Sequence, residues 1–186
     1  MNDKFIVIGI TRPYNFPEEI KKITSLISSG KVNFLHIRKP TFSIEETAEF
    51  INKIPKEMHP YLKIHDHFGL LNDYDLGGVH LNNRNPHWHS EVKSKSKSIH
   101  SLEELDRFED FDYMTLSPVF DSISKKGYES AFDLKKISSR IRGKRIVALG
   151  GVTPEKFELL KNSGFYGGAM LGYLWENEQS QISNLF

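Results

Sequence analysis

Strand-like and helix-like segments alternate eight times along the 186 residues of this chain. The strand-like segments are short and largely apolar, as in strands that a parallel sheet buries on both faces. Four are residues 5–10, 32–37, 61–64 and 78–81; one ends at residue 99; three are residues 113–116, 145–149 and 167–171. Such an alternation indicates parallel strands joined by crossover helices, and a (β/α)8 barrel is its natural closure. We expect one α/β domain over residues 1–186.

The chain is short for this fold, because a barrel of eight units typically needs about 250 residues. Some connections must therefore be trimmed. The polar stretch at residues 82–89 has no helical pattern, so we expect the helix after the fourth strand to be short or missing. By contrast, capping boxes at residues 43–46 and 101–104 predict helices after the second and fifth strands.

Composition excludes several classes of protein. A net charge of +1 without a basic face or tail argues against a nucleic-acid-binding protein. The absence of cysteine excludes disulfides and thiolate chemistry. No apolar run approaches membrane-spanning length, and the first residues lack the zones of a signal peptide, so we expect a cytoplasmic protein with no membrane partner. The sequence is compatible with a homodimer.

A loop of hydroxyl, ammonium and glycine residues follows the sixth strand. Ser122, Ser124 and Lys125 are followed by Lys126 and Gly127. Hydroxyls beside ammonium groups on a sharply turning loop are typical of a phosphate or diphosphate site. The same short motif is also typical of a solvated surface loop, so its position in the strand order decides its interpretation.

Polar residues also follow the other predicted strands. In a (β/α)8 barrel the carboxyl ends of all strands meet at one face, where catalytic groups lie and where phosphate often binds after the last two strands. The residues that the sequence places at this face are His36, Arg38, His65, Asp66, Asn85, Ser98 and His100, with the glycines Gly150, Gly151 and Gly172. This combination suits a phosphorylated substrate with a divalent ion.

The histidines have structural interpretations as well. His80 lies inside the fourth strand, where a packed or hydrogen-bonded core residue is expected. His65, Asp66 and His67 are consecutive, and neighbouring strand residues point to opposite faces, which disfavours a zinc site made by all three. His100 is equally compatible with a structural role and with a role at the active site.

Several segments together resemble the thiamine phosphate synthase and thiazole tautomerase family. They are residues 34–38, 65–66, 78–81, 98–101, the loop after the sixth strand, and residues 148–152. The resemblance extends from the first strand to the eighth. It implies an enzyme of thiamine biosynthesis that joins hydroxymethylpyrimidine diphosphate to thiazole phosphate and releases diphosphate. Its partners would be these small phosphorylated substrates.

The resemblance also implies roles for individual residues. Arg38 and Lys125 would hold the diphosphate, and Asp66 with Asn85 would hold Mg²⁺. Ser98 would lie near the pyrimidine and diphosphate. The remaining substrate contacts implied by the family pattern are Ser122, Ser124, Gly151, Met170, Leu171 and Gly172.

Departures from the family pattern leave alternatives open. Asn85 stands where synthases have a second metal-binding aspartate, so metal binding should weaken. His36 resembles the tautomerase branch, but Pro118 stands where that branch has its catalytic histidine. A tautomerase-like enzyme with His36 or His65 as acid and base, a non-catalytic binder of thiazole phosphate or thiamine phosphate, and a barrel phosphate-binder of another pathway are the competing hypotheses.

Overall fold

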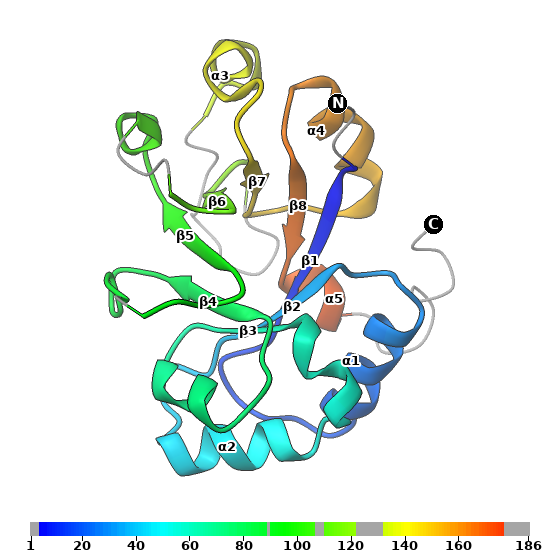
Figure 1. Ribbon diagram of the computed structural model, residues 1–186. Helices are drawn as coiled ribbons and strands as arrows, with labels where there is room; N and C mark the ends of the chain where they lie inside the picture. The colour runs from blue at the N-terminus through cyan, green and yellow to red at the C-terminus, as the bar shows by residue number, and fades with distance from the viewer. Residues whose placement is uncertain (1–3, 89, 107–109, 122–131, 177–186) are drawn as a thin grey trace.

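Eight parallel strands close into a barrel, as the sequence predicts (Figure 1). The computed structural model describes residues 4–88, 90–106, 110–121 and 132–176. Each strand pairs with the next in the chain, and the last pairs with the first. The strands are β1 (Ile6–Ile10), β2 (Phe34–Ile37), β3 (Leu62–Ile64), β4 (Gly78–Leu81), β5 (Lys95–Ile99), β6 (Tyr113–Leu116), β7 (Ile146–Ala148) and β8 (Gly167–Met170).

Helices cover the outside of the barrel. The α-helices are α1 (Glu19–Ser28), α2 (Ile44–Asn52), α3 (Leu134–Ile141), α4 (Phe157–Asn162) and α5 (Gly172–Glu176). Short 3-10 helices are η1 (Lys56–Tyr61), η2 (Phe68–Asn72), η3 (Glu103–Asp106) and η4 (Pro154–Lys156). None of the described helices is both long and apolar enough to cross a membrane.

The two capping boxes have different outcomes. Ser43 and Glu46 form the reciprocal bonds of the box, and α2 follows. The box at residues 101–104 is only half formed: the Glu104 carboxylate accepts from the backbone N–H groups of His100 and Ser101 at 2.9 and 3.1 Å. Residues Glu103–Asp106, which overlap the box, form the 3-10 helix η3, and the rest of the predicted helix, as far as Phe108, lies outside the described residues. Between β4 and β5 the described residues contain no helix, which confirms the trimming expected there.

Side chains alternate between the outside and the inside of the barrel. Val7, Leu35 and Ile64 belong to the larger apolar cluster, which includes residues of α1, α2, α3 and α4. Ile6, Ile8 and other strand residues form a second, smaller cluster with Tyr113. Helix packing on the outer face therefore leaves the inner face of each strand free to carry other side chains.

The barrel encloses a buried lysine. Lys63 on β3 is fully buried, and its Nζ donates to Ser94 Oγ and lies 4.2 Å from the ring centroid of Tyr113. Burial disfavours the charged form and lowers the pKa of Lys63 to about 7. A lysine in the unfolded chain keeps its ordinary pKa, so the unfolded state binds more protons above neutral pH.

We therefore expect Lys63 to make the free energy of unfolding rise with pH. Between pH 7 and pH 10.5 the unfolded lysine is protonated while the folded one is not. This contributes up to about 1.4 kcal/mol per pH unit. Lys63→Met should remove that rise, as chemical denaturation across the pH range would measure. Lys53→Met, at an exposed lysine, is the control. Parallel stability curves for wild type and Lys63→Met would contradict the account.

Candidate functional site

A cavity of about 810 Å³ opens at the carboxyl ends of the strands. Residues from the loops after most of the strands line it, including Arg12 after β1 and Gly172 after β8. Its polar and glycine lining consists of Arg12, Tyr14, Arg38, His65, His80, Asn82, Asn83, Arg84, Ser98, His100, Ser117, Gly150, Gly151, Gly172 and Tyr173. Six of the predicted site residues line this cavity: Arg38, His65, Ser98, Gly151, Leu171 and Gly172. His36, Asp66, Asn85 and Met170 are not part of its lining.

Two arginines, Arg38 and Arg84, line this cavity. Arg38 directly follows β2, and its backbone N–H donates to Thr11 Oγ1 at 2.8 Å. Burial is the largest cause that lowers the pKa of Arg38; the nearby Arg84 guanidinium also lowers it, while Asp66 acts in the opposite direction. Because like charges disfavour each other, an anion bound beside Arg38 and Arg84 would be stabilised by both.

Asp66 is held by an ion pair. Arg84 donates to its carboxylate through Nε and Nη2 at 3.1 to 3.2 Å. Asn85 Nδ2 donates to Asp66 Oδ1 at 2.7 Å and to the backbone oxygen of His65 at 3.0 Å. The Asp66 side chain is 15% exposed and that of Arg84 is 43% exposed, so the ion pair lies at the solvent-accessible mouth of the cavity.

This arrangement does not fit a Mg²⁺ ion. Mg²⁺ binds oxygen ligands such as carboxylates. Here the carboxylate of Asp66 already accepts hydrogen bonds from the guanidinium of Arg84. The amide of Asn85 turns its NH₂ group, not its oxygen, toward Asp66. An ion at Asp66 would have to displace Arg84 and reverse Asn85. The geometry therefore does not support the expectation from the sequence that Asp66 and Asn85 hold Mg²⁺.

The side chain of Asn82 positions the backbone of Arg84 beside Asp66. Its Oδ1 accepts from the backbone N–H groups of Arg84 and Asn85 at 3.0 and 3.3 Å, which folds the loop after β4 into a tight turn. Its Nδ2 donates to the backbone oxygen of His65 at 2.9 Å. The sequence analysis did not predict Arg84 and Arg12 as site residues. Both follow predicted strands, and that position could have identified them.

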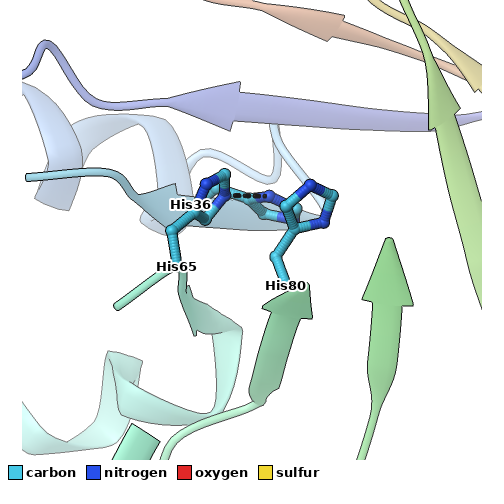
Figure 2. A group of neighbouring side chains, drawn as sticks. All are labelled: His36, His65 and His80. Atoms are coloured by element: carbon cyan, nitrogen blue, oxygen red, sulfur yellow. Dashed lines mark hydrogen bonds between the residues drawn. The ribbon is translucent and has the colours of Figure 1, made fainter. Parts of the chain in front are cut away.

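Three histidines meet beneath the cavity, from β2, the end of β3, and β4 (Figure 2). His36 Nδ1 lies 3.0 Å from His65 Nε2, and His36 Nε2 lies 2.6 Å from the hydroxyl of Tyr113. His80 contacts the hydroxyls of Ser96 and Ser98 at 2.9 and 2.8 Å. As expected, His80 is buried and hydrogen-bonded; unlike a pure core residue, it also lines the cavity.

Burial keeps these rings neutral. It is the main cause that lowers the pKa values of His36 and His65 well below the ordinary value and that of His80 to about 3. The charge of Lys63 lowers the pKa values of His36 and His80 further. The three rings are therefore uncharged at neutral pH.

Neutral imidazoles can ligate a transition metal, and one nitrogen of each ring lies within 4.8 Å of the others. A tetrahedral zinc site needs nitrogens about 3.3 Å apart whose lone pairs converge on one point. The rings of His65 and His80 instead stack, with centroids 4.3 Å apart and planes 29° apart. The cluster is arranged for hydrogen bonding rather than for an ion.

Serine and histidine side chains also lie where β5 and β6 end. Ser98 lines the cavity, and Thr115 Oγ1 donates to its hydroxyl at 3.4 Å. His100 Nδ1 lies 3.2 Å from the backbone oxygen of Ser117 and 3.3 Å from its hydroxyl. His100 therefore both lines the cavity and joins two neighbouring loops.

The loops after β7 and β8 complete the cavity. Gly151 has a φ of 59°, and a Cβ there would overlap the backbone oxygen of Asp121. Only glycine lets these two loops approach so closely. Leu171 and Gly172 line the cavity, whereas the Met170 side chain is buried in the apolar cluster that includes the helices. Ser122, Ser124 and Lys125 lie outside the described residues.

Comparison with known proteins agrees with the closed eight-stranded barrel. The family model for thiamine monophosphate synthase matches residues 7–174. The chain therefore belongs to the thiamine monophosphate synthase family, which confirms the resemblance seen in the sequence. No match was found among curated protein sequences.

Several solved structures have a similar fold. Thiamine phosphate pyrophosphorylase from Bacteroides thetaiotaomicron is similar at 30% identity and a TM-score of 0.82, over 97% of this chain and 92% of that one. The thiamine phosphate pyrophosphorylase from Pyrococcus furiosus is 19% identical with a TM-score of 0.72, over 91% and 87%. A geranylgeranylglyceryl phosphate synthase from Thermoplasma acidophilum, 12% identical with a TM-score of 0.61 over 99% and 91%, shares the fold.

The ion pair on Asp66 leads to a test. Arg84→Ala should free the carboxylate, so we expect Mg²⁺ to bind more tightly to the variant than to wild type, as isothermal titration calorimetry would show. Arg142→Ala, at an exposed arginine at the end of α3, is the matched control and should leave Mg²⁺ binding unchanged. Equal or weaker Mg²⁺ binding by Arg84→Ala would show that the guanidinium does not block the site.

Proposed function

We propose that this protein is a thiamine phosphate synthase, a transferase that joins hydroxymethylpyrimidine diphosphate to thiazole phosphate and releases diphosphate. The observation that carries the proposal is that Arg38 and Arg84 both line the carboxyl-end cavity. The likeness to a pyrophosphorylase at 30% identity over nearly the whole chain supports it.

Loss of diphosphate places growing negative charge on the departing oxygen, so catalysis depends on cations fixed around the leaving group. Arg38 is suited to this task because it is partly desolvated and its backbone is anchored to Thr11. Lys125, from the loop after β6, would add a second positive charge. Arg84 supplies a guanidinium at the position where the family resemblance implies a metal.

The other substrate contacts follow from the same cavity. Ser98 would approach the pyrimidine and the diphosphate. The hydroxyls of Ser122 and Ser124 and the backbone around Gly151 and Gly172 would hold the phosphate of the thiazole, because close backbone N–H groups bind anions well. Met170 and Leu171 would contribute through their backbone beside Gly172.

The family resemblance implies Mg²⁺ held by Asp66 and Asn85, but the hydrogen bonds of Arg84 and of the Asn85 amide to Asp66 disfavour an ion there. When bound, it would neutralise charge on the diphosphate. Because the guanidinium of Arg84 already lies at the Asp66 carboxylate, we expect only a weak dependence of the reaction on Mg²⁺.

The proposal is tested by incubating the purified protein with both substrates and following thiamine phosphate by mass spectrometry. Formation of thiamine phosphate with release of diphosphate would support the synthase. Binding of both substrates without product would favour a non-catalytic binder of thiazole phosphate or thiamine phosphate.

Arg38→Met should lower kcat/KM of this reaction by about 100-fold or more, because it removes a fixed cation from the leaving group while keeping side-chain length. Arg142→Met is the matched control. Comparison of steady-state kinetics and of thermal melting separates a catalytic loss from an unfolded variant. Unchanged kcat/KM in a folded Arg38→Met protein would remove Arg38 from the mechanism.

Lys125→Ala should likewise abolish turnover without changing the thermal melting of the protein. The lysine would supply charge to the leaving group and make no contribution to the apolar core. Lys126→Ala, at the neighbouring lysine, tests whether the effect belongs to one position. Full activity of Lys125→Ala would contradict the role given to the loop after β6.

A second candidate function is isomerisation of a thiazole carboxylate phosphate by transfer of a proton. The observation that favours it is the neutral His65 ring at the cavity, with His36 behind it. A neutral imidazole can both accept and donate a proton. This reaction would be independent of metal, so complete loss of activity with a chelator would count against it.

A further inference from the structure

A buried ion pair joins the loops that follow β1 and β2. Lys39 Nζ donates to the two carboxylate oxygens of Glu19 at 2.9 and 2.7 Å, and to the backbone oxygen of Tyr14 at 2.9 Å. Both charged side chains are at most 2% exposed, and neither residue belongs to the cavity lining. The ammonium group has three donors, so the protein itself uses all of them.

The surroundings of Lys39 make the pairing necessary. Its Nζ lies 4.6 Å from the ring centroid of Phe50 and 5.5 Å from that of Phe42. Burial is the largest cause that lowers the pKa of Lys39 and raises that of Glu19, and each partner acts against the effect of burial on the other. A buried charge is costly unless it is paired, so each side chain needs the other.

A second contact joins the same two loops. The backbone N–H of Arg38 donates to Thr11 Oγ1 at 2.8 Å, and the Thr11 hydroxyl donates to the backbone oxygen of Arg38 at 3.4 Å. Lys39 is the next residue after Arg38, and Tyr14 lies three residues after Thr11. The loops are therefore fastened to each other at two places, with Arg12 between them.

The fastened segments carry side chains of the cavity lining. Arg12 and Tyr14 of the first loop and Arg38 of the second all border the cavity. Lys39 does not, although it directly follows Arg38. Its charge is matched by Glu19 and does not add to the cations of the cavity. Its contact with the Tyr14 backbone instead fixes the loops that carry them.

The backbone just before Glu19 has an uncommon conformation. Glu18 has a φ of 66°, in the left-handed region that residues other than glycine seldom adopt. Such a conformation persists where the surrounding contacts over-determine it. The ion pair of Glu19 with Lys39, from the neighbouring loop, is a contact of this kind. Strain at the start of α1 is therefore balanced by the tie between the loops.

We propose that Lys39 and Glu19 are positioning residues of the anion site. Their ion pair holds the two loops together and so fixes the backbone from which Arg38 reaches a bound diphosphate. The inference deepens the proposed function and rests on it. Neither residue touches the ligand, and both act through Arg38. A cation that is fixed before the ligand arrives loses less conformational entropy on binding.

Replacement of both partners separates positioning from stability. Removing one partner of a buried pair is strongly destabilising, whereas replacing both by apolar residues of similar size is often neutral. The double variant Lys39→Met/Glu19→Met should therefore fold, but it cannot donate to the Tyr14 backbone oxygen. Lys161→Met/Glu158→Met, at an exposed pair on α4, is the matched control. Both double substitutions leave the net charge unchanged.

The first measurement is the affinity for inorganic diphosphate without divalent metal, by isothermal titration calorimetry, together with thermal melting. We expect Lys39→Met/Glu19→Met to bind diphosphate at least about 10-fold more weakly than wild type at a similar melting temperature. A charge-assisted bond from a guanidinium contributes a factor of that order. The control variant should bind as wild type does. Wild-type affinity in a folded Lys39→Met/Glu19→Met protein would overturn the proposal.

Single variants separate positioning from direct contact. If Lys39 left Glu19 to bind diphosphate itself, Lys39→Met would weaken binding, whereas Glu19→Gln would leave it unchanged or strengthen it. Positioning predicts that both single variants weaken binding, and that the double variant is no worse than the weaker-binding single variant, because the two residues act as one unit. Opposite effects of the two single variants would overturn the proposal in favour of a direct contact.

Amide hydrogen exchange tests the tie between the loops without any ligand. The Phe42 amide donates to the backbone oxygen of Lys39 at 3.0 Å. In Lys39→Met/Glu19→Met it should exchange at least about 10-fold faster than in wild type, because the charged bonds that keep this turn closed are gone. The Val79 amide, which donates to the backbone oxygen of Ser94, is the internal control. Equal Phe42 rates in the two proteins would overturn the proposal.

Kinetics connect the ion pair with the reaction. If the wild type forms thiamine phosphate, Lys39→Met/Glu19→Met should lower kcat/KM by about 100-fold, because a small displacement of a positioned group costs that order of rate. An unchanged kcat/KM would overturn the proposal.

Failure of the proposed function is distinguishable from failure of this inference. A wild type that binds diphosphate but forms no thiamine phosphate would reject the synthase, and the diphosphate affinities of the variants would then decide the role of Lys39 and Glu19. A wild type that binds no diphosphate would overturn both.

Discussion

The pairing of β8 with β1 is the interaction on which the rest of the structure depends. It closes the sheet, with Ile6 opposite Gly167 and Val7 opposite Gly168. A Cβ at Gly167 would overlap the backbone oxygen of Ile6, so the closing pair needs a residue without a side chain there. Only because the sheet closes do the first and last loops, with Arg12 and Gly172, border the same cavity. The site is a consequence of ring closure rather than of any one motif.

Closure also creates an enclosed interior, and this chain fills much of it with polar groups. Buried polar groups destabilise a fold unless they are hydrogen-bonded. Within the described residues, Trp88 Nε1 is the fully buried side-chain polar atom without a partner, whereas His36 and His80 each use both ring nitrogens in hydrogen bonds. Lys63 lies in the same interior, where its charge disfavours imidazolium formation in His36 and His80. Arginine side chains and the neutral rings of His65 and His80 therefore lie at the same end of the barrel.

The sequence predicted the fold well, because strand and helix patterns depend on local periodicity. The exception is β5, whose sequence Lys-Ser-Lys-Ser-Ile contains one apolar residue, so that only its end was recognised. The missing helix after β4 was predictable for the same reason. The interactions between loops were not: the pairing of Arg84 with Asp66 depends on the turn that Asn82 builds in the following loop. The histidine cluster depends on strand register, which sets His36 beside Lys63 across two strands and brings His80 to the same level. Neither can be derived from the spacing of residues along the chain.

The most direct test of the account is a crystal structure of the protein with inorganic diphosphate in the absence of divalent metal. The account predicts diphosphate oxygens within hydrogen-bond distance of the guanidinium groups of Arg38 and Arg84, at the cavity bordered by Gly151. Diphosphate bound elsewhere, or bound there only when Mg²⁺ is added and Arg84 has left Asp66, would contradict it.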